Sequence, residues 1–310
     1  MTNWYGIKEQ CAGRYRLLFL WNFYRLFRLK GLKIVLYPVV FFIFLFSKNA
    51  RLTSQKYQIV LHDYQTKHNI KPTKISSYGH IFSYAFSLAE KMSAVCDEKS
   101  PLQFEVCPDE NWVSFQEDMK KGIFLISSHL GNIEALSAFP RQFKQLPAPT
   151  VNALMQVNQN SIFHQFIEEK SNNPYFRLYP AEEFDFGQIM ELHEKISNGE
   201  FILMAGDRVS FQNTKDVIPA KLLDKDCFLP NGVFKFAQKI NHPTYAVLLL
   251  RTKTGAYRLC LQKLNMSQKT PDIAQNYVAF LEKHLLQYPE QWYNFFDFFQ
   301  IAHTNVLTYQ

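Results

Sequence analysis

The chain has 310 residues, which is enough for one large domain with an appendage and for a sizeable core. Hydrophobic residues make up 47% of it and aromatic residues 16%, including 29 phenylalanines, so large apolar surfaces have to be accommodated. The five cysteines are odd in number and no two of them have CxxC spacing. This pattern argues against a disulfide framework and a zinc site, and favours a reducing compartment.

The net charge of +7 is concentrated near the N-terminus. Between residues 10 and 62 there is no Asp or Glu, whereas the same stretch holds nine Lys and Arg side chains. The rest of the chain therefore has 34 − 9 = 25 cations against 27 acids, and it is close to neutral. The overall charge does not indicate what the larger part binds, and we expect no nucleic acid among its partners.

This basic stretch is also the most apolar part of the chain. Residues 34–47 form an uncharged run of fourteen, IVLYPVVFFIFLFS, which Pro38 interrupts. A spanning helix needs about 20 apolar residues. Aromatic rings beside Arg and Lys suit the interface of an anionic bilayer. We predict that residues 1–60 associate with a membrane without spanning it; the alternative is a buried core helix. A cleaved signal peptide is not expected, because the run starts late and no small-residue cleavage site follows.

The remainder, residues 61–310, is predicted to be one α/β domain. Residues 51–120 have a mostly helical pattern with loops, and short buried strands begin after residue 121. Strands alternating with helices favour a sheet that is covered on both faces. The expected strands are 122–127, 150–155, 201–205, 244–251 and 257–261, and the expected helices in this part are 186–197 and 272–287.

One segment combines residues that can carry acid–base chemistry. His129 follows a predicted buried strand, and Glu134 lies in the first turn of a helix expected near Asn132. We expect the Glu134 carboxylate to hold one imidazole nitrogen, which leaves the other nitrogen facing outward as a base. Gly131 lacks a side chain and could let a bulky thioester approach. Free N–H groups at the helix start could stabilise developing negative charge.

The His-x4-acid spacing alone is weak support for a site. It occurs twice, at His129 with Glu134 and at His164 with Glu169. Five residues along a helix turn by about 500°, which would leave the second pair on different faces. Only His129 follows a buried strand and has Gly and Asn in its turn. On this context alone, a catalytic histidine and a satisfied structural histidine remain equal alternatives.

The segment SSHLGNIEA resembles the lysophospholipid acyltransferase superfamily, and most closely its late acyltransferases of lipid A biosynthesis. Their signature is a His-x4-Glu block with Gly-Asn inside it. Three further blocks agree in order and spacing, so the resemblance covers nearly the whole chain. They are Gly206-Asp207-Arg208 after the strand FILMA, the segment from Phe228 to Gly232 with Pro230, and Pro289-Glu290-Gln291-Trp292.

This resemblance implies a fold like that of glycerol-3-phosphate acyltransferases, with a central mixed sheet flanked by helices. It implies transfer of a fatty acyl group to a hydroxyl of a lipid or glycolipid, at the cytoplasmic face of a bacterial inner membrane. The donor would be acyl-carrier protein or acyl-CoA, with no metal or bound cofactor. His129 and Glu134 would be catalytic. The residues expected at the substrate are Gly131, Asn132, Asp207, Arg208, Pro230 and Gly232.

The chain departs from the lipid A enzymes at two places. Ile133 stands where many of them have an aromatic residue, and Gly206-Asp207-Arg208 replaces their Asp-Gln pair. The second feature is similar to a less characterised branch, so the acceptor could be lipid A-like or another lipid-linked product. Arg208 could hold a phosphate or carboxylate with Asp207 orienting it, or the two could be a simple charge pair at a strand end.

Other interpretations of the sequence remain open. Pro230 and Gly232 could wall the acyl site or form an ordinary turn into a helix. A hydrolase needs a nucleophilic serine, but no G-x-S-x-G elbow is present and neither Ser127 nor Ser128 has an elbow context. A metal at His129 would need a third ligand. A non-catalytic lipid-binding protein on the same fold is the remaining alternative. The aromatic residues after Gln291 are expected in the core rather than at a membrane.

Overall fold

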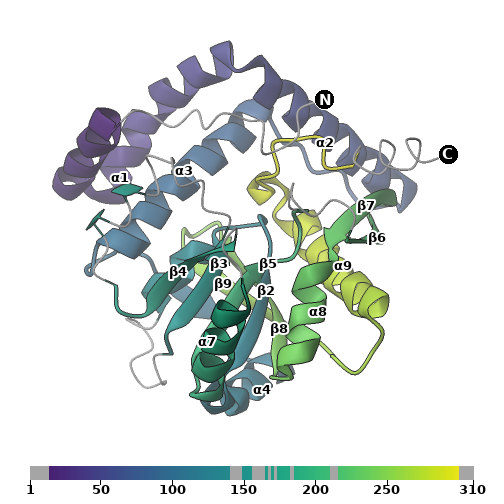
Figure 1. The fold of residues 1–310 in the computed structure, drawn as a ribbon. Helices are drawn as coiled ribbons and strands as arrows, with labels where there is room; N and C mark the ends of the chain where they lie inside the picture. Colours follow the sequence, from purple (N-terminus) through teal and green to yellow (C-terminus); the bar gives the residue numbers. More distant parts are fainter. Residues whose placement is uncertain are drawn as a thin grey trace.

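The structure is a computed structural model, and it describes residues 14–139, 149–155, 165–166, 169–170, 173–181, 185–209 and 216–299. Seven α-helices within these ranges surround a central sheet (Figure 1). The helices are α1 (Arg14–Phe46), α2 (Lys48–Lys67), α3 (Ser77–Cys96), α4 (Glu110–Asp118), α7 (Phe186–Ser197), α8 (Asn231–Ile240) and α9 (Thr270–Gln287). The 3-10 helices are η2 (Met119–Lys121), η3 (Ile133–Ala138) and η6 (Pro289–Gln291). The strands are β1 (Phe104–Val106), β2 (Ile123–Ser127), β3 (Val151–Met155), β4 (Phe176–Pro180), β5 (Phe201–Ala205), β6 (Val217–Leu222), β7 (Lys225–Pro230), β8 (Thr244–Arg251) and β9 (Tyr257–Lys263).

The main sheet has seven strands in the order β1-β9-β8-β2-β5-β3-β4. The five strands from β8 to β4 are parallel to one another, whereas β9 runs antiparallel to β8 and parallel to β1. Because β2 and β5 are both parallel and adjacent, their carboxyl ends meet at the same edge. The predicted fold class, a central mixed sheet flanked by helices, is confirmed.

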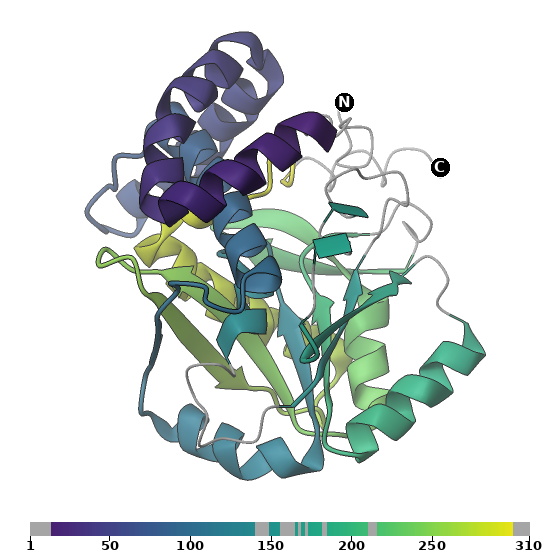
Figure 2. The same cartoon turned by 90° about the vertical axis from the view of Figure 1, so that its left-hand side faces the viewer.

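Each central strand supplies side chains to two separate cores, because successive residues of a strand point to opposite faces. In β2, Phe124 and Ile126 belong to one buried cluster, and Ile123 and Leu125 belong to another. The first cluster lies under α7, α8 and α9, and the second lies under α4 and η3. Figure 2 shows the sheet between these two layers. Burial on both faces explains why the central strands read as continuous apolar runs.

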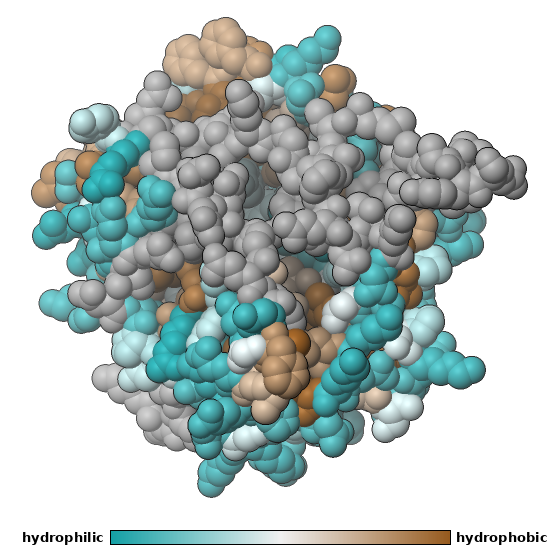
Figure 3. Space-filling model, in the orientation of Figure 1, coloured by the Kyte–Doolittle hydropathy of each residue, from teal (hydrophilic) through white to brown (hydrophobic). Residues whose placement is uncertain are grey.

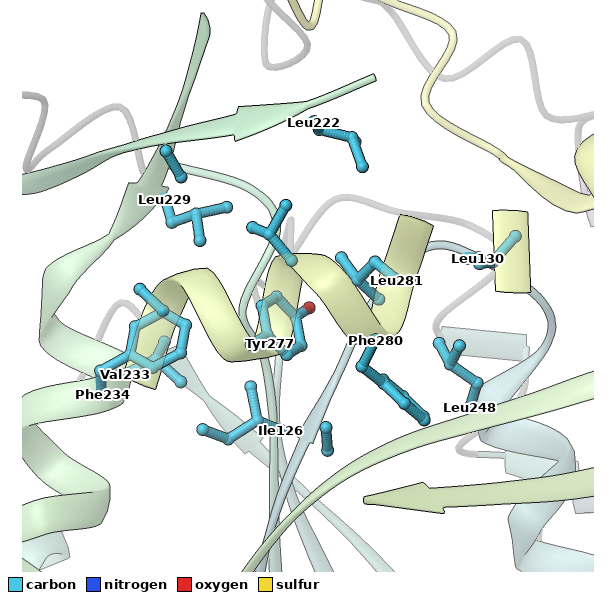
Figure 4. Packing of buried hydrophobic residues seen from close by; sticks show 14 of the residues in the cluster. Ile126, Leu130, Leu222, Leu229, Val233, Phe234, Leu248, Tyr277, Phe280 and Leu281 are labelled. Atoms are coloured by element: carbon cyan, nitrogen blue, oxygen red, sulfur yellow. The ribbon is translucent and has the colours of Figure 1, made fainter. Parts of the chain in front are cut away.

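The β6–β7 hairpin and α8 cover α9 on one side of the sheet. Leu222 and Leu229 from the hairpin and Phe234 from α8 pack around Tyr277 and Leu281 of α9 (Figure 4). Tyr277 also donates a hydrogen bond from its hydroxyl to the carbonyl of Ser127 at the end of β2, with an oxygen–oxygen distance of 2.6 Å. The apolar core is therefore tied directly to the edge of the sheet where β2 ends.

The N-terminal helix α1 is broken at Arg28, whose φ is 56°, and it continues through Pro38. The expectation that Pro38 interrupts the apolar run was wrong. The break lies where Arg28 Nη1 contacts Asp97 Oδ2 at 2.5 Å, just after α3. By length and composition, Leu17–Phe46 could cross a membrane, and only 22% of its most apolar window is buried. Apolar side chains project where α1 meets α2, at the top of the view in Figure 3.

The strands and helices that were predicted with bounds from the sequence are all present, and their ends agree within two residues. Four strands were not predicted: β1, β4, β6 and β7. Each of these includes partly or fully exposed positions. The proposed division into residues 1–60 and 61–310 stays a prediction, and α2 runs across position 60.

Candidate active site

The candidate site lies where β2 and β5 end beside each other. Ser127 of β2 is paired in register with Ala205 of β5. His129 lies two positions after Ser127, and Asp207 lies two positions after Ala205. The Gly206 N–H donates to the Ser127 carbonyl at 2.8 Å. The parallel register therefore brings together two residues that are 78 positions apart in sequence. Ligands of α/β proteins commonly bind beyond the carboxyl ends of such strands.

The imidazole of His129 and the carboxylate of Asp207 form a close pair. His129 Nδ1 lies 2.9 Å from Asp207 Oδ1, and the His129 backbone N–H donates to Asp207 Oδ2 at 2.8 Å. The Asp207 side chain is 0% exposed. Burial alone would raise the pKa of this carboxyl, but the charge and hydrogen bonds of His129, with the charge of Arg208, lower it to about 2. Asp207 is therefore ionised at neutral pH.

The other nitrogen of the imidazole faces outward. The His129 side chain is 33% exposed, and its ring hydrogen bond to Asp207 uses Nδ1. Within the described ranges, no side chain or backbone group bonds Nε2. Because the carboxylate can only accept, Nδ1 carries the proton in the neutral imidazole, and Nε2 is then the proton acceptor. This is the geometry of a general base.

The expected contact between Glu134 and the imidazole is not observed. Asp207 holds Nδ1 instead, and Glu134 Oε1 accepts a hydrogen bond from Lys91 Nζ on α3 at 2.7 Å. Burial alone would raise the pKa of Glu134, but the charge and hydrogen bond of Lys91 lower it, and the charge of His129 adds to this. The charge of His129 therefore reaches Glu134, and Glu134 is paired with Lys91 of α3.

The N–H groups of residues 129–132, which lead into the expected helix, are already used within the fold, and stabilisation of negative charge by the first N–H groups of the helix itself stays a prediction. The helix itself is the six-residue 3-10 helix η3, which begins at Ile133. Four consecutive N–H groups donate within the fold: His129 to Asp207 Oδ2, Leu130 to Ser128 Oγ, Gly131 to the Gln291 carbonyl and Asn132 to the Leu249 carbonyl. Stabilisation of negative charge by these four groups is therefore ruled out in this conformation.

Gly131 and Asn132 fit closely into the fold. Gly131 has a φ of 86°, and a Cβ built on it would lie 2.3 Å from the carbonyl oxygen of Leu249. Its missing side chain thus accommodates β8 rather than an approaching thioester. The Asn132 side-chain amide donates to the Ser87 carbonyl at 2.9 Å and to the Tyr257 hydroxyl at 3.2 Å. Both residues position the loop that carries His129, and contact of either with substrate stays a prediction.

Arg208 lies beside Asp207 and is linked to it through Asn294. Arg208 Nε donates to Asn294 Oδ1 at 2.7 Å, and Arg208 Nη2 donates to the Tyr293 carbonyl at 3.0 Å. The guanidinium carbon is 5.6 Å from the ring centroid of Phe296. Asn294 Nδ2 in turn donates to Asp207 Oδ2 at 3.1 Å. The cation is therefore built into the His129–Asp207 site.

The C-terminal segment around Trp292 forms one wall of the site. The Gly131 N–H donates to the Gln291 carbonyl, Leu130 forms an antiparallel bridge with Trp292, and the Tyr293 N–H donates to the His129 carbonyl. The aromatic residues of this segment were predicted in the core, and neither Asn294 nor Lys91 was predicted at the site. Asn294 lies two residues after the Pro-Glu-Gln-Trp block, a position that could have drawn attention to it.

Neither serine before His129 has the setting of a nucleophile. Ser127 and Ser128 are buried. Ser127 Oγ donates to the Met204 carbonyl at 3.4 Å, and Ser128 Oγ accepts from the Leu130 N–H at 3.0 Å. These contacts disfavour a hydrolase that uses either serine.

Pro230 and Gly232 lie at the turn from β7 into α8. Pro230 ends β7, in register with Val217 of β6, and Gly232 is exposed with no atom within 4 Å of a built Cβ. No contact of either residue with His129 is observed in the described part of the chain, and their role at an acyl site stays a prediction. His164 lies outside the described residues. Across the described ranges, no group of three or more His, Cys, Asp or Glu side chains could hold a metal ion.

The sequence of the chain matches a known protein family over most of its length. The family described as bacterial lipid A biosynthesis acyltransferase matches residues 63–300, which include every residue of the site. No individually curated protein matches the chain.

Proposed function

Because the chain belongs to the bacterial lipid A biosynthesis acyltransferase family, we propose that it moves a fatty acyl group from a thioester donor to a hydroxyl of a lipid or glycolipid. Membership of this family makes the chain a lipid acyltransferase. The oxygen acceptor and the thioester donor, acyl-carrier protein or acyl-CoA, are the proposed part. The observation that carries the proposal is an imidazole with an outward Nε2, held through Nδ1 by the buried carboxylate of Asp207.

The proposed reaction is direct transfer in one active site. His129 Nε2 takes the proton of the acceptor hydroxyl while the hydroxyl oxygen attacks the thioester carbonyl carbon. The carbon–sulfur bond then breaks, and the thiolate leaves with a proton from the imidazolium. Asp207 fixes the imidazole tautomer and stabilises the charged imidazolium without itself taking a proton, in keeping with its lowered pKa. No metal or bound cofactor takes part in this scheme.

Negative charge on the carbonyl oxygen needs a partner other than the N–H groups of residues 129–132. Two cations contact residues of the site: Arg208, which is linked to Asp207 through Asn294, and Lys91, which is paired with Glu134. We assign the stabilisation of the oxyanion to these side chains. Glu134 remains in the proposed site as the residue that holds Lys91, and Asp207 takes the orienting role that was expected of Glu134.

The acceptor is proposed to carry an anionic group that Arg208 recognises. The guanidinium is fixed by Asn294 and by the Tyr293 carbonyl, so it presents a defined geometry to a phosphate or carboxylate. This proposal includes a lipid A-like phosphoglycolipid and other lipid-linked products. Mass spectrometry of lipids from cells with and without the gene would identify the class, because one lipid should lose the mass of one fatty acyl group.

The N-terminal helices are proposed to hold the enzyme on the cytoplasmic face of a bacterial inner membrane. Large exposed apolar side chains gather at the turn between α1 and α2, including Phe42 and Phe46. Arg51 Nη1 donates to the carbonyls of Phe44 and Leu45, which satisfies backbone groups at the end of α1. Cations without acids around this turn favour contact with anionic lipid.

Transfer by the purified chain tests the proposal. A labelled fatty acyl thioester of acyl-carrier protein or of CoA is incubated with bacterial lipid extract, and labelled lipid is measured. We expect His129→Ala to lose about 10²–10⁴ in rate, whereas His193→Ala, at an exposed position on α7, should retain the wild-type rate. Transfer by a folded His129→Ala protein near the wild-type rate would contradict the mechanism. Absence of transfer by the wild type would favour a non-catalytic lipid-binding protein.

A further inference from the structure

The amide of Asn294 joins two groups of opposite hydrogen-bonding character. Its Oδ1 accepts from Arg208 Nε at 2.7 Å, and its Nδ2 donates to Asp207 Oδ2 at 3.1 Å. A guanidinium can only donate and a carboxylate can only accept, so these partners fix the orientation of the amide. Asn294 is 3% exposed. A buried side chain at this place needs one acceptor and one donor, and Asn supplies both.

This bridge determines which partner the Asp207 carboxylate has. Asp207 and Arg208 are adjacent in sequence and opposite in charge, so the carboxylate has a competing partner beside it. Among the described residues, the Asp207 carboxylate accepts hydrogen bonds from His129 and Asn294 alone. The Asn294 amide occupies Oδ2 together with the His129 N–H, which leaves Oδ1 directed at His129 Nδ1. The carboxylate therefore has one orientation relative to the imidazole.

The backbone holds Asn294 in this place independently of its side chain. The Tyr293 N–H donates to the His129 carbonyl at 2.8 Å, and the Gly131 N–H donates to the Gln291 carbonyl at 2.9 Å. These antiparallel contacts fix the residue before Asn294 against the loop that carries His129. A substitution at Asn294 can thus change the amide while the segment stays in position.

We propose that Asn294 is a positioning residue for the acyl transfer, acting through Asp207 and Arg208 on His129. The inference rests on the proposed function for its effect on rate. Its effect on the imidazole does not depend on that function. Asn294 keeps the carboxylate on His129 Nδ1 and keeps the guanidinium apart from it as a separate cation for substrate. The chain of contacts runs from Arg208 through Asn294 and Asp207 to the imidazole.

Other charged or titratable groups face this network from the neighbouring elements, and they stay unchanged in the variants below. Tyr277 of α9 feels the charge of Asp207, and Glu134 of η3 feels the charge of both His129 and Arg208. On α3, Tyr84 interacts with Arg208, and Lys91 pairs with Glu134. Any shift in the titration of His129 in a variant of Asn294 is therefore measured against a constant surrounding.

Three substitutions separate the two halves of the amide. Asn294→Asp has the same shape and retains an acceptor for Arg208, but it places a second carboxylate oxygen against Asp207. Asn294→Leu removes both hydrogen bonds at a similar volume. Asn294→Gln retains both groups on a longer side chain. The matched control is Asn241→Asp, which adds the same charge at an exposed position after α8, where the chain enters the amino end of β8.

The measurement is the NMR titration of the imidazoles in full-length protein labelled with ¹³C-histidine in detergent micelles, with the signal of His129 identified from His129→Gln. We expect the midpoint of the His129 titration to rise by about one pH unit in Asn294→Asp, because a second negative charge favours the imidazolium. It should not rise in Asn294→Leu, Asn294→Gln or Asn241→Asp. In the acyl-transfer assay, kcat/KM should fall about 10–100-fold in Asn294→Asp and Asn294→Leu, because the base is misplaced. Asn294→Gln should have a kcat/KM between those of these two variants and the wild type.

An unchanged midpoint in a folded Asn294→Asp protein would overturn the proposal, as would equal rises in Asn294→Asp and Asn241→Asp. Wild-type kcat/KM in Asn294→Leu would also overturn it. Thermal unfolding checks that each variant is folded, and Asn294→Asp is the decisive one if the Leu variant does not fold. Lack of transfer by the wild type would contradict the proposed function, and the NMR titration would still decide whether Asn294 controls the imidazole.

Discussion

Ser127 and Ala205 are register partners at the carboxyl ends of two adjacent parallel strands. This pairing places the residues two positions further on, His129 and Asp207, within hydrogen-bonding distance. Both strands were predicted from their apolar runs, and both runs end at polar residues. Their adjacency was not predicted, because β3 and β4 come between them in sequence. The site therefore depends on strand order, which local patterns do not specify.

The first prediction separates Asp207 from Glu134 as the partner of the imidazole. Asp207→Asn keeps the size of the side chain but can present an N–H donor to Nδ1, which would favour the wrong tautomer, so we expect kcat/KM to fall by about 10²–10⁴. Glu134→Gln keeps an acceptor for Lys91 and should lose only about tenfold. Steady-state kinetics with a fixed acyl thioester measures both. A larger loss in Glu134→Gln than in Asp207→Asn would restore the His-x4-Glu assignment made from the sequence.

Strands that are buried on both faces could be predicted from the sequence, whereas features that depend on tertiary contacts could not. The central strand Phe201–Ala205 was predicted with its observed ends because its side chains pack on both faces of the sheet. The half-exposed strands β6 and β7 have weaker patterns and were missed. The break in α1 was expected at Pro38 but lies at Arg28, whose guanidinium contacts Asp97 in a distant part of the chain. No local rule indicates that contact.

The second prediction concerns the two glycines that were expected at the substrate. Gly131→Ala should destabilise the fold by on the order of 3 kcal/mol, because Gly131 has a φ of 86° and a Cβ would meet the Leu249 carbonyl at 2.3 Å. Gly232→Ala should be neutral or stabilising by about 0.5–1 kcal/mol, since it lies in the first turn of α8 with open space around it. Thermal unfolding of the two variants measures the difference. Equal stability would contradict the assigned role of Gly131.

The third prediction follows from His80, a buried histidine behind the site. Its Nε2 lies 2.6 Å from the Trp292 carbonyl, and its Nδ1 lies 2.9 Å from Ser54 Oγ. Burial lowers the pKa of His80 to about 4, although the hydrogen bond to Trp292 opposes this. The unfolded chain then binds a proton that the folded chain excludes between pH 6.5 and 4. This contribution to stability is present above pH 6.5 and is lost as the pH falls towards 4.

We therefore expect the free energy of unfolding to fall by about 3 kcal/mol through His80 as the pH is lowered from 6.5 to 4. His80→Gln keeps a neutral donor and should show a smaller fall. His284, whose pKa is also lowered by burial, supplies a change of the same sign that remains in the variant. The check is the thermal midpoint at several pH values, with exposed His193→Gln as control. An unchanged pH dependence in His80→Gln would contradict the prediction.

The geometry of the N-terminal helices bears on how the chain meets a membrane. After the break at Arg28, the second part of α1 covers residues 29–46, about 27 Å at 1.5 Å per residue, which is slightly less than the hydrocarbon core. α2 then returns, and α3 packs against both helices. Both ends of this hairpin therefore lie on the side of the sheet, and the turn between α1 and α2 is the part directed away from it (Figures 1 and 2).

The last prediction is that this turn inserts into one leaflet. Phe42 and Phe46 are 59% and 84% exposed, so Phe42→Asp with Phe46→Asp should weaken binding to vesicles containing anionic lipid by on the order of 100-fold or more. Phe186→Asp with Met190→Asp is the matched control, because these exposed apolar residues lie on α7. High salt alone should release only part of the wild type, since apolar burial is not screened. Vesicle flotation measures both pairs. Insertion into one leaflet would be contradicted if the two double variants lost vesicle binding equally, or if high salt released all of the wild type. It would also be contradicted if residue 46 could be labelled from the far side of the bilayer.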